Sequence, residues 1–523
     1  MAKNTVLVTG ASRGIGHAIA SRCIADGYEV IGLSSQASDA MPWQHYGVDL
    51  AGPDAISHLS EIITKHRPCR FVGNAGVLIN GRLEDVKADD FARLMRVNLL
   101  SLMETTQLMQ NAAAQNKAQF LGSDYWSGHK LADEFTRSSA SLWPESRVWQ
   151  ITKEREVFFS QKGKAHRAQA GAILIATGAM ERPMPITGWT LPGVMTIGAA
   201  QTMLKTSHSG VDGALFVGSG PLFYLTIWQY LNAGFDIKAV IDTTPGKMSL
   251  LHYFWALPAL LQPSMLIKGL KWRSEIRRKT HYISGATAVS ISGDSQAEAL
   301  CFTDASGKQH RLEAEHIFLH QGVVPSINLT MATELEHRWC PRQLCWHPKT
   351  DIFGESSVQQ IFVAGDGMGI AGAAAAISSG KIAAMRITAK ARGTSSLNAV
   401  FQMVRQVQKM AIRPFLDYAF KPADEWLVPH DENAIICRCE SLTKADITKA
   451  ITLGVSGPNQ LKSFSRAGMG RCQGRMCGLT IQKMITDHNS QSDDKTGYYR
   501  LRPPIRPLTV GELAALADDT PTS

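Results

Sequence analysis

The sequence predicts an α/β fold, with Rossmann-like nucleotide-binding units followed by a small helical domain that carries four clustered cysteines. Apolar strands run into glycine turns at 5–16 and at 214–221, and a helical run follows each turn. This is the strand–loop–helix unit of nucleotide-binding sheets. Four of the nine cysteines stand near the C-terminal end. A chain of 523 residues has room for about three domains with cores of their own.

Composition and charge exclude several classes of protein. Apolar residues make up 44% of the chain and charged residues 19%, which is ordinary for a globular protein. The net charge is +9, but the basic residues are scattered, so we expect a solvated surface and no nucleic acid partner. The most apolar stretch, 250–270, is interrupted by prolines and polar residues and predicts no transmembrane segment. Nine cysteines without a signal-peptide pattern favour a reducing cytoplasm.

The first region, residues 1–118, opens with a short strand and the turn TGASRGIG at 9–16. Its glycines let the backbone approach a pyrophosphate at the N-terminus of the following helix, where free N–H groups favour an anion. Further strands end at VDL (48–50) and at FVGNAG (71–76). Side chains at such strand ends meet at one edge of a parallel sheet.

These motifs resemble the N-terminal half of the short-chain dehydrogenase/reductase family. The resemblance implies that the glycine loop cradles the pyrophosphate, and that Asp49 and the Asn-Ala-Gly turn at 74–76 lie at the adenine. Arg13, with no acidic residue closing the second strand, implies NADP rather than NAD. The implied cofactor-binding residues are Gly10, Arg13, Gly14, Ile15, Gly16, Asp49, Asn74, Ala75 and Gly76. A nucleotide-binding fold kept only as a scaffold is the alternative.

A short-chain dehydrogenase needs a tyrosine and a lysine four residues later, on one face of a helix. Here Tyr125 and Lys130 are five residues apart, and Ser123 is only two residues before the tyrosine. A spacing of five turns the lysine away from the tyrosine. We therefore expect no working reductase site in this region, and the resemblance ends near residue 119.

Residues 119–425 are expected to form the next region, with a second nucleotide-binding subdomain at about 205–325. Antiparallel strands are predicted at 146–160, and a buried strand runs into ATGAMERP at 176–183. The motif VGSGPL at 217–222 opens a second strand–loop–helix unit, in which Asp242 ends the next strand and can bind ribose hydroxyls. The Pro-Leu-Phe after Gly220 departs from the usual glycine spacing. Which nucleotide binds there, if any, stays open.

A third glycine-rich segment delivers Asp366 from a strand to the start of an alanine-rich helix. The N-terminus of that helix suits a phosphate or the electron-rich edge of a flavin. The small residues at 369–376 allow a close approach of a ligand to the backbone.

The motifs ATGAMERP, GWTLPGVMT (188–196), VGSGPL and AGDGMGIAGA (364–373) resemble the larger subunits of opine oxidase, hydrogen cyanide synthase and bacterial proline and hydroxyproline dehydrogenases. The resemblance runs from about residue 120 to about residue 516. It implies a two-dinucleotide-binding flavoprotein architecture. FAD is then expected at Thr177, Gly178, Gly365 and Asp366, and NAD(P) or another adenine nucleotide at Gly218, Gly220 and Asp242. The usual N-terminal FAD unit of this group is replaced by the short-chain-dehydrogenase-like unit.

The four clustered cysteines lie in CRCE (437–440) and GMGRCQGRMCG (468–478), within a domain expected at 430–490. Four thiolates from two short loops are what a [2Fe–2S] cluster needs. The expected ligands are Cys437, Cys439, Cys472 and Cys477, and the arginines expected to offset the cluster charge are Arg438, Arg466, Arg471 and Arg475. Zinc and unligated thiols are the alternatives, although C-x-C is a poor zinc loop. The stretch resembles the bacterioferritin-associated-ferredoxin-like [2Fe–2S] domain.

Several residues outside these motifs also carry structural predictions. Thr443 and Asp446 predict a variant capping box at the start of a helix. The tail at 491–523 has a proline-rich part at 502–507, which we expect to be extended along a neighbouring domain or subunit. Cys340 and Cys345 have the C-x4-C spacing of the redox disulfide in some flavin reductases, but their context favours incidental thiols. His337 and His347 are expected to be surface histidines.

Three hypotheses of function follow. The first is an FAD- and [2Fe–2S]-dependent electron-transfer subunit of an amino-acid or opine dehydrogenase. The resemblance implies that a smaller flavoprotein subunit oxidises the substrate, so no catalytic residue is named in this chain. The second is an NADP-dependent short-chain reductase, which the missing Tyr–Lys spacing opposes. The third is a defective fusion that binds a nucleotide without turnover.

Overall fold

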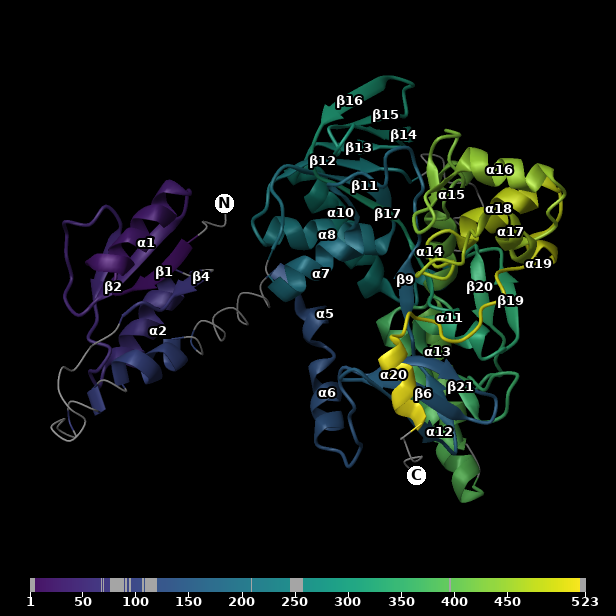
Figure 1. Ribbon diagram of the computed structural model, residues 1–523, viewed down its shortest axis with the longest axis horizontal. Helices are drawn as coiled ribbons and strands as arrows, with labels where there is room; N and C mark the ends of the chain where they lie inside the picture. Colours follow the sequence, from purple (N-terminus) through teal and green to yellow (C-terminus); the bar gives the residue numbers. More distant parts are fainter. Residues whose placement is uncertain are drawn as a thin grey trace. The chain divides into compact units, whose positions relative to one another are not determined.

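The computed structural model describes residues 5–66, 68, 70–75, 89, 92–93, 96–105, 108, 120–207, 209–244, 257–394 and 397–517. The chain forms two compact units (Figure 1), residues 1–139 with 229–235, and residues 140–228 with 236–523. Within the described ranges, no helix combines the length and the apolar character required to cross a membrane.

The first unit is built on a four-stranded parallel sheet in the order β3-β2-β1-β4. Its elements alternate along the chain: β1 (Thr5–Thr9), α1 (Gly14–Ala25), β2 (Glu29–Ser34), β3 (Gln44–Gly47), α2 (Ala55–His66) and β4 (Arg70–Val72). Strand β1 is buried along its whole length because it pairs on both sides. The strand order reverses at β1, so the carboxyl ends of β1 and β4 frame the crevice in which such sheets bind nucleotides.

The alternation of side chains along β1 divides the core of this unit into two layers. Leu7 joins a buried cluster with residues of α2, including Leu59 and Ile63. Val6 and Val8 point to the other face, where they cluster with Ala20 of α1. Farther along the chain come η2 (Arg96–Leu100), α5 (Ser123–Trp126) and α6 (His129–Thr136).

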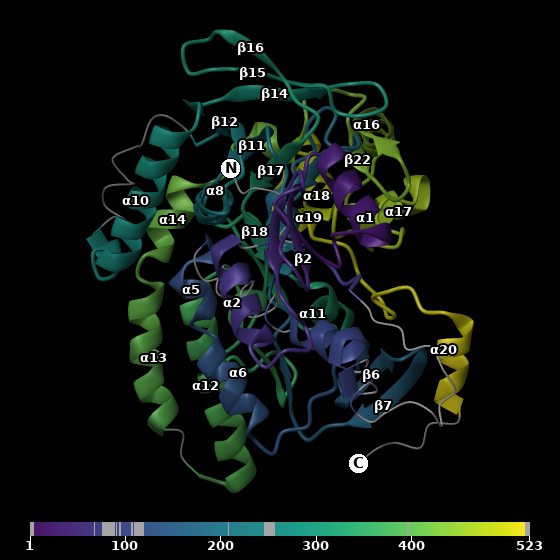
Figure 2. The ribbon, with the colours of Figure 1, turned by 90° about the vertical axis from the view of Figure 1, so that its left-hand side faces the viewer.

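The second unit contains the other strand–glycine loop–helix sheet, which is parallel in the order β10-β17-β11-β12-β13. Its elements are β10 (Val194–Thr196), α7 (Ile197–Ser207), β11 (Ala214–Ser219), α8 (Pro221–Asn232), β12 (Ile237–Asp242), α10 (Pro263–Lys279), β13 (Tyr282–Ser284) and β17 (Ile317–Gln321). The small antiparallel sheet of β14 (Thr287–Ser292), β15 (Ala299–Thr303) and β16 (Gln309–Glu313) lies beyond the β12–β13 edge (Figures 1 and 2).

The flavoprotein-like part of this unit is made of short strands that pair across long stretches of sequence. It comprises β5 (Arg147–Ile151), β6 (Glu156–Gln161), β7 (Lys164–Gln169), β8 (Ile173–Ile175), β9 (Ala179–Glu181), β18 (Val323–Pro325), α11 (Asn328–Ala332), β19 (His337–Cys340), β20 (Cys345–Pro348), β21 (Ile361–Val363), η3 (Gly365–Gly367), α12 (Ala373–Arg392) and α13 (Leu397–Met410). Strand β21 pairs in parallel with β8, and α12 lies beside α13 (Figure 2). The predicted antiparallel strands at 146–160 are confirmed as β5 and β6.

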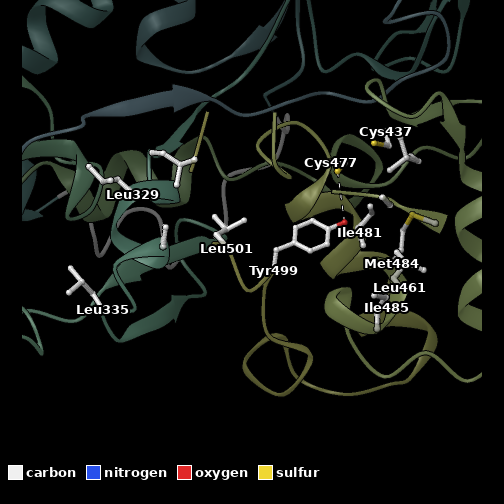
Figure 3. Close-up of a cluster of buried hydrophobic side chains, with 14 of the residues drawn as sticks. Leu329, Leu335, Cys437, Leu461, Cys477, Ile481, Met484, Ile485, Tyr499 and Leu501 are labelled. Atoms are coloured by element: carbon white, nitrogen blue, oxygen red, sulfur yellow. Dashed lines mark hydrogen bonds between the residues drawn. The ribbon is translucent and has the colours of Figure 1, made fainter. Parts of the chain in front are cut away.

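The C-terminal part is mostly helical, with α14 (Arg413–Ala419), α15 (Asp424–Leu427), β22 (Ile435–Cys437), β23 (Leu442–Thr443), α16 (Lys444–Thr452), α17 (Pro458–Ser465), α18 (Gly478–His488), α19 (Asp493–Thr496), α20 (Val510–Ala514) and η4 (Ala515–Ala517). Thr443 and Asp446 form the predicted capping box of α16. Leu501 and Ile505 of the C-terminal tail are buried in the same core cluster as Ile481. Leu501 and Ile481 are labelled in Figure 3. The α/β class predicted from the sequence is confirmed.

Candidate functional site

The four cysteines of the C-terminal loops come together as two pairs of thiols. Cys437 ends β22 and hydrogen-bonds to Cys477, which precedes α18. Cys439 hydrogen-bonds to Cys472. The first pair is buried and the second is half-buried. Over the described ranges, no group of three or more His, Cys, Asp or Glu side chains that could hold a metal ion is found.

Backbone amides point at the sulfur atoms of this site. The pKa of Cys437 is lowered to about 6, first by its hydrogen bond with Cys477, and also by the amides of Gly468, Glu440 and Cys439. The partner thiol of Cys477 has its pKa raised by the same hydrogen bond and by burial. Burial also raises the pKa of Cys472, whereas hydrogen bonds with the backbone of Met476 and Gly474 act to lower it. Amides that stabilise negative sulfur suit an iron–sulfur cluster.

The glycines of these loops are required by close packing. A Cβ on Gly470 would overlap the side chain of Cys439. A Cβ on Gly468 or Gly474 would overlap the ring of Tyr499, and both glycines have positive φ, +84° and +79°, which favours glycine. The hydroxyl of Tyr499 lies 3.9 Å from Cys477 Sγ (Figure 3).

Three of the arginines expected to offset a cluster charge have other partners as well. Arg466 pairs with Glu440 at 3.2 Å, and Arg438 lies over the ring of Trp189 at 5.4 Å. Arg475 donates to the backbone oxygen of Cys472 at 3.1 Å, which keeps a cation beside one candidate ligand. That these arginines offset the charge of a cluster stays a prediction.

The N-terminal glycine loop is closed at its base by contacts between β1 and the end of β4. Gly10 has φ +69°, and a Cβ on Gly16 would overlap the oxygen of Gly10. The side-chain amide of Asn74 donates to that same oxygen at 3.4 Å. Thr9 Oγ1 accepts hydrogen bonds from the amides of Asn74 and Ala75 at 3.0 and 3.1 Å. Thr9 was missed by the sequence reasoning, although it directly precedes the glycine motif.

The other candidate residues of the first unit lie around this loop. Arg13 caps the start of α1 without a side-chain hydrogen bond to the helix, and Ile15 is 74% exposed. Gly14 has room for a Cβ but has φ +58°. Asp49 accepts hydrogen bonds from the amide of Ala51 at 3.1 Å and from Arg93 at 3.4 Å. Gly76, the last candidate of this unit, lies outside the described residues.

The tyrosine and lysine of a short-chain reductase are not brought onto one helix. Tyr125 belongs to α5, which ends at Trp126, and Lys130 belongs to α6, which begins at His129. This break agrees with the spacing argument from the sequence.

The second glycine loop is built around a fully buried carboxylate. Asp242 is 0% exposed and accepts hydrogen bonds from the hydroxyl of Tyr224 at 2.6 Å, the hydroxyl of Tyr282 and the amide of Thr244 at 2.8 Å. Arg273 lies 3.5 Å from the same carboxylate. The tyrosines and the arginine were missed by the sequence reasoning because they are 18 to 40 residues away. A ribose would have to displace one of these partners.

The two glycines of that loop lie beside the end of β17. A Cβ on Gly218 would overlap the backbone oxygen of His320, and a Cβ on Gly220 would lie 4.0 Å from its ring. His320 Nδ1 lies 2.6 Å from Glu181 Oε1. The backbone of both glycines therefore lies close to the hydrogen-bonded pair of His320 and Glu181 at the carboxyl end of the sheet.

The third glycine segment joins the ends of β8 and β21. Asp366 Oδ1 accepts hydrogen bonds from the amides of Ala371 and Gly372 at 2.9 and 2.8 Å, which folds the loop back before α12. A Cβ on Gly367 would lie 3.1 Å from Thr177 Oγ1, so Thr177 and Gly178 lie beside this loop. Gly365 and the residues after Gly367 line a cavity of about 720 Å³.

Comparisons with known proteins follow the same division of the chain. A family model for the short chain dehydrogenases matches residues 4–119, and one for the sarcosine oxidase A3 domain matches residues 432–517. The A subunit of opine oxidase from Rhizobium meliloti is 39% identical over 76% of this chain and 78% of its own length. The chain belongs to the family of opine oxidase A subunits. The resemblance predicted from the motifs is confirmed.

More distant proteins are similar to the chain in sequence or in fold. Hydrogen cyanide synthase subunit HcnB from Pseudomonas aeruginosa is 29% identical over 69% of the chain and 80% of its own length. The crystal structure of L-proline dehydrogenase from P. horikoshii shares the fold with a TM-score of 0.54 at 14% identity, over 98% of this chain and 79% of that one. The chain is a flavin-dependent oxidoreductase.

Proposed function

We propose that this chain is the electron-transfer subunit of an enzyme complex that oxidises the C–N bond of an amino acid or an opine. The observation that carries the proposal is the meeting of Cys437, Cys439, Cys472 and Cys477 as two thiol pairs, with backbone amides directed at the sulfur atoms. The related A subunits of opine oxidase supply the substrate class. A cytoplasmic location is part of the proposal, since none of the eight cysteines in the described ranges is in a disulfide.

The two thiol pairs fit a [2Fe–2S] cluster better than a zinc ion. Each iron of such a cluster takes two cysteine sulfurs, which matches the pairs Cys437–Cys477 and Cys439–Cys472. A structural zinc site needs four ligands around one point. A [2Fe–2S] cluster exchanges single electrons, whereas a flavin takes two. In this proposal the chain holds the sulfur atoms and places backbone amides beside the negative charge of the cluster. Gly470 leaves the space that a side chain would take from Cys439.

FAD is proposed for the loop at Gly365 and Asp366 together with Thr177 and Gly178. The N-terminus of α12 follows this loop, and a helix N-terminus suits an anionic cofactor. An adenine nucleotide is proposed for the N-terminal loop at Gly10 and Gly16. Analysis of the nucleotides that the purified protein releases on denaturation identifies them.

A smaller flavoprotein subunit is the proposed partner, and the substrate is oxidised there. The relatives are named as single subunits of opine oxidase and of sarcosine oxidase, which implies companion subunits in those enzymes. The N-terminal unit does not favour a short-chain reductase as a second function, because Tyr125 and Lys130 stand on separate helices.

The experiment is anaerobic purification followed by an absorption spectrum and by iron, sulfide and flavin assays on one sample. The proposal expects flavin and two irons per chain, as the composition of one [2Fe–2S] cluster requires. A colourless protein that still binds a nucleotide would support the defective-fusion hypothesis instead. Carbonyl reduction by NADPH without flavin would support the short-chain reductase.

A further inference from the structure

A second cysteine pair lies on the hairpin of β19 and β20. Cys340 stands directly opposite Cys345 in the antiparallel register. Residues opposite each other have Cα atoms about 4.5–5.5 Å apart and point to one face, and disulfides span Cα separations of about 4.4–6.8 Å. Both residues are free thiols in this structure. The hairpin can therefore close a disulfide without separating its strands.

The two thiols differ in access. Cys340 is half-buried and lines the 720 Å³ cavity, whereas Cys345 is only 2% exposed. Arg338 and Arg342 line the same cavity, so its wall favours an anionic molecule. A small molecule that enters the cavity meets Cys340 first, and Cys345 stands behind it.

A histidine lies beside the buried thiol. His347 Nε2 lies 3.5 Å from Cys345 Sγ. Burial lowers the pKa of His347 to about 4, so the ring is neutral near pH 7. On its other side the ring lies against the glycine loop, where a Cβ on Gly369 would be 3.0 Å from Cε1 and Nδ1.

A buried cation completes the surroundings of Cys345. Arg182 is 5% exposed and donates to the backbone oxygens of Gln343 and Leu344 at 2.6 and 3.0 Å. These bonds fix the turn of the hairpin. Its Nε has no hydrogen-bond partner among the described residues. Burial raises the pKa of the Cys345 thiol to about 12, and Arg182 acts in the opposite direction, so a thiolate formed there has a cation beside it.

We propose that Cys340 and Cys345 form a redox-active dithiol whose substrate is an anionic low-molecular-weight disulfide that enters this cavity. The thiolate of Cys340 attacks one sulfur of that disulfide, which forms a mixed disulfide and releases one thiol. Cys345 then attacks the Cys340 sulfur, which closes the Cys340–Cys345 bond and releases the second thiol, and the protons of Cys340 and Cys345 end on the two released thiols. The protein loses two electrons and two protons, and the small disulfide gains both.

The test equilibrates the full-length protein with mixtures of reduced and oxidised glutathione, quenches with acid and alkylates the remaining thiols. Trypsin cleaves after Arg342, between the two cysteines, so the disulfide appears as two linked peptides. The expected result is one midpoint at which both thiols disappear together. The proposal is overturned if Cys340 and Cys345 react with glutathione separately, or stay alkylated over the whole range. Mass spectrometry of these peptides does not depend on the iron–sulfur cluster or on the function proposed above.

Two variants sharpen this test. Cys345→Ser should trap the glutathione mixed disulfide on Cys340, and its failure to do so would contradict the order of attack. Cys301→Ser removes a half-buried thiol of another sheet and should leave the midpoint as in the wild type.

Discussion

The chain contains two C-x4-C pairs, Cys472–Cys477 and Cys340–Cys345, with four residues between the cysteines of each pair. The local backbone structure around the two pairs differs. The first pair lies in a glycine-rich loop before α18, and each of its thiols pairs with a cysteine more than 30 residues upstream. The second pair closes a hairpin on itself, with each cysteine opposite the other.

The difference shows that the chain around the cysteines decides their chemistry. In the C-terminal loops, amides of Gly468, Gly474 and Met476 are free to point at sulfur. In the hairpin, a histidine and a buried arginine surround one thiol, and the other faces a cavity. Amides stabilise a metal-bound thiolate, whereas an accessible thiol with a second thiol opposite it favours exchange.

The largest expected effect is a loss of iron when a cysteine of the C-terminal loops is replaced, but not when a cysteine of the hairpin is replaced. Cys472→Ser removes one of the four proposed ligands and should weaken retention of the cluster by more than about 100-fold, so iron per chain falls close to zero. Cys340→Ser, at the first position of the other C-x4-C pair, should leave iron unchanged. Iron and sulfide assays on both variants check this. Equal iron in the two variants would show that the pairs do not differ as described.

The next effect concerns the packing that surrounds the proposed ligands. Gly470→Ala places a Cβ into the side chain of Cys439, which should cost about 1–3 kcal/mol of stability and lower the iron content. Gly511→Ala, in α20 and with open space around the new Cβ, is the matched control. Thermal unfolding and iron analysis give the two readouts. Gly470→Ala with wild-type iron and wild-type stability would contradict the close packing.

A third effect is a pH dependence that belongs to the hairpin. Burial lowers the pKa of both His337 and His347 to about 4, whereas an unfolded histidine has a pKa of about 6.5. Between these values the unfolded chain binds protons that the folded chain does not, so stability falls as pH decreases from 6.5 towards 4. Each histidine contributes up to about 3 kcal/mol to this loss.

The measurement is urea unfolding across that pH range, with His337→Gln expected to flatten the curve. His488→Gln changes an exposed histidine at the end of α18 and should leave the curve as in the wild type. An equally flat curve for the control would assign the pH dependence to other groups.

The sequence predicted the motifs well and their surroundings less well. The glycine loops, the antiparallel strands near 150 and the capping box at Thr443 follow local rules, so they could be found from spacing alone. The enclosure of Asp242 by Tyr224, Tyr282 and Arg273 could not, because these partners come from separate elements that only tertiary packing brings together.

The expectation for His347 was wrong for a similar reason. His347 was expected at the surface and is only 8% exposed. Antiparallel pairing turns its side chain inward beside Cys345. The same pairing placed Cys340 on a cavity wall, whereas the sequence context had favoured incidental thiols.

The most direct test of the central claim is electron paramagnetic resonance of the anaerobically reduced wild-type protein, measured beside Cys472→Ser and Cys340→Ser with iron counted in each sample. The account predicts the signal of a reduced [2Fe–2S] cluster at two irons per chain in the wild type and in Cys340→Ser, and its loss in Cys472→Ser. Zinc in place of iron, or a wild-type protein without signal and without iron, would contradict the account.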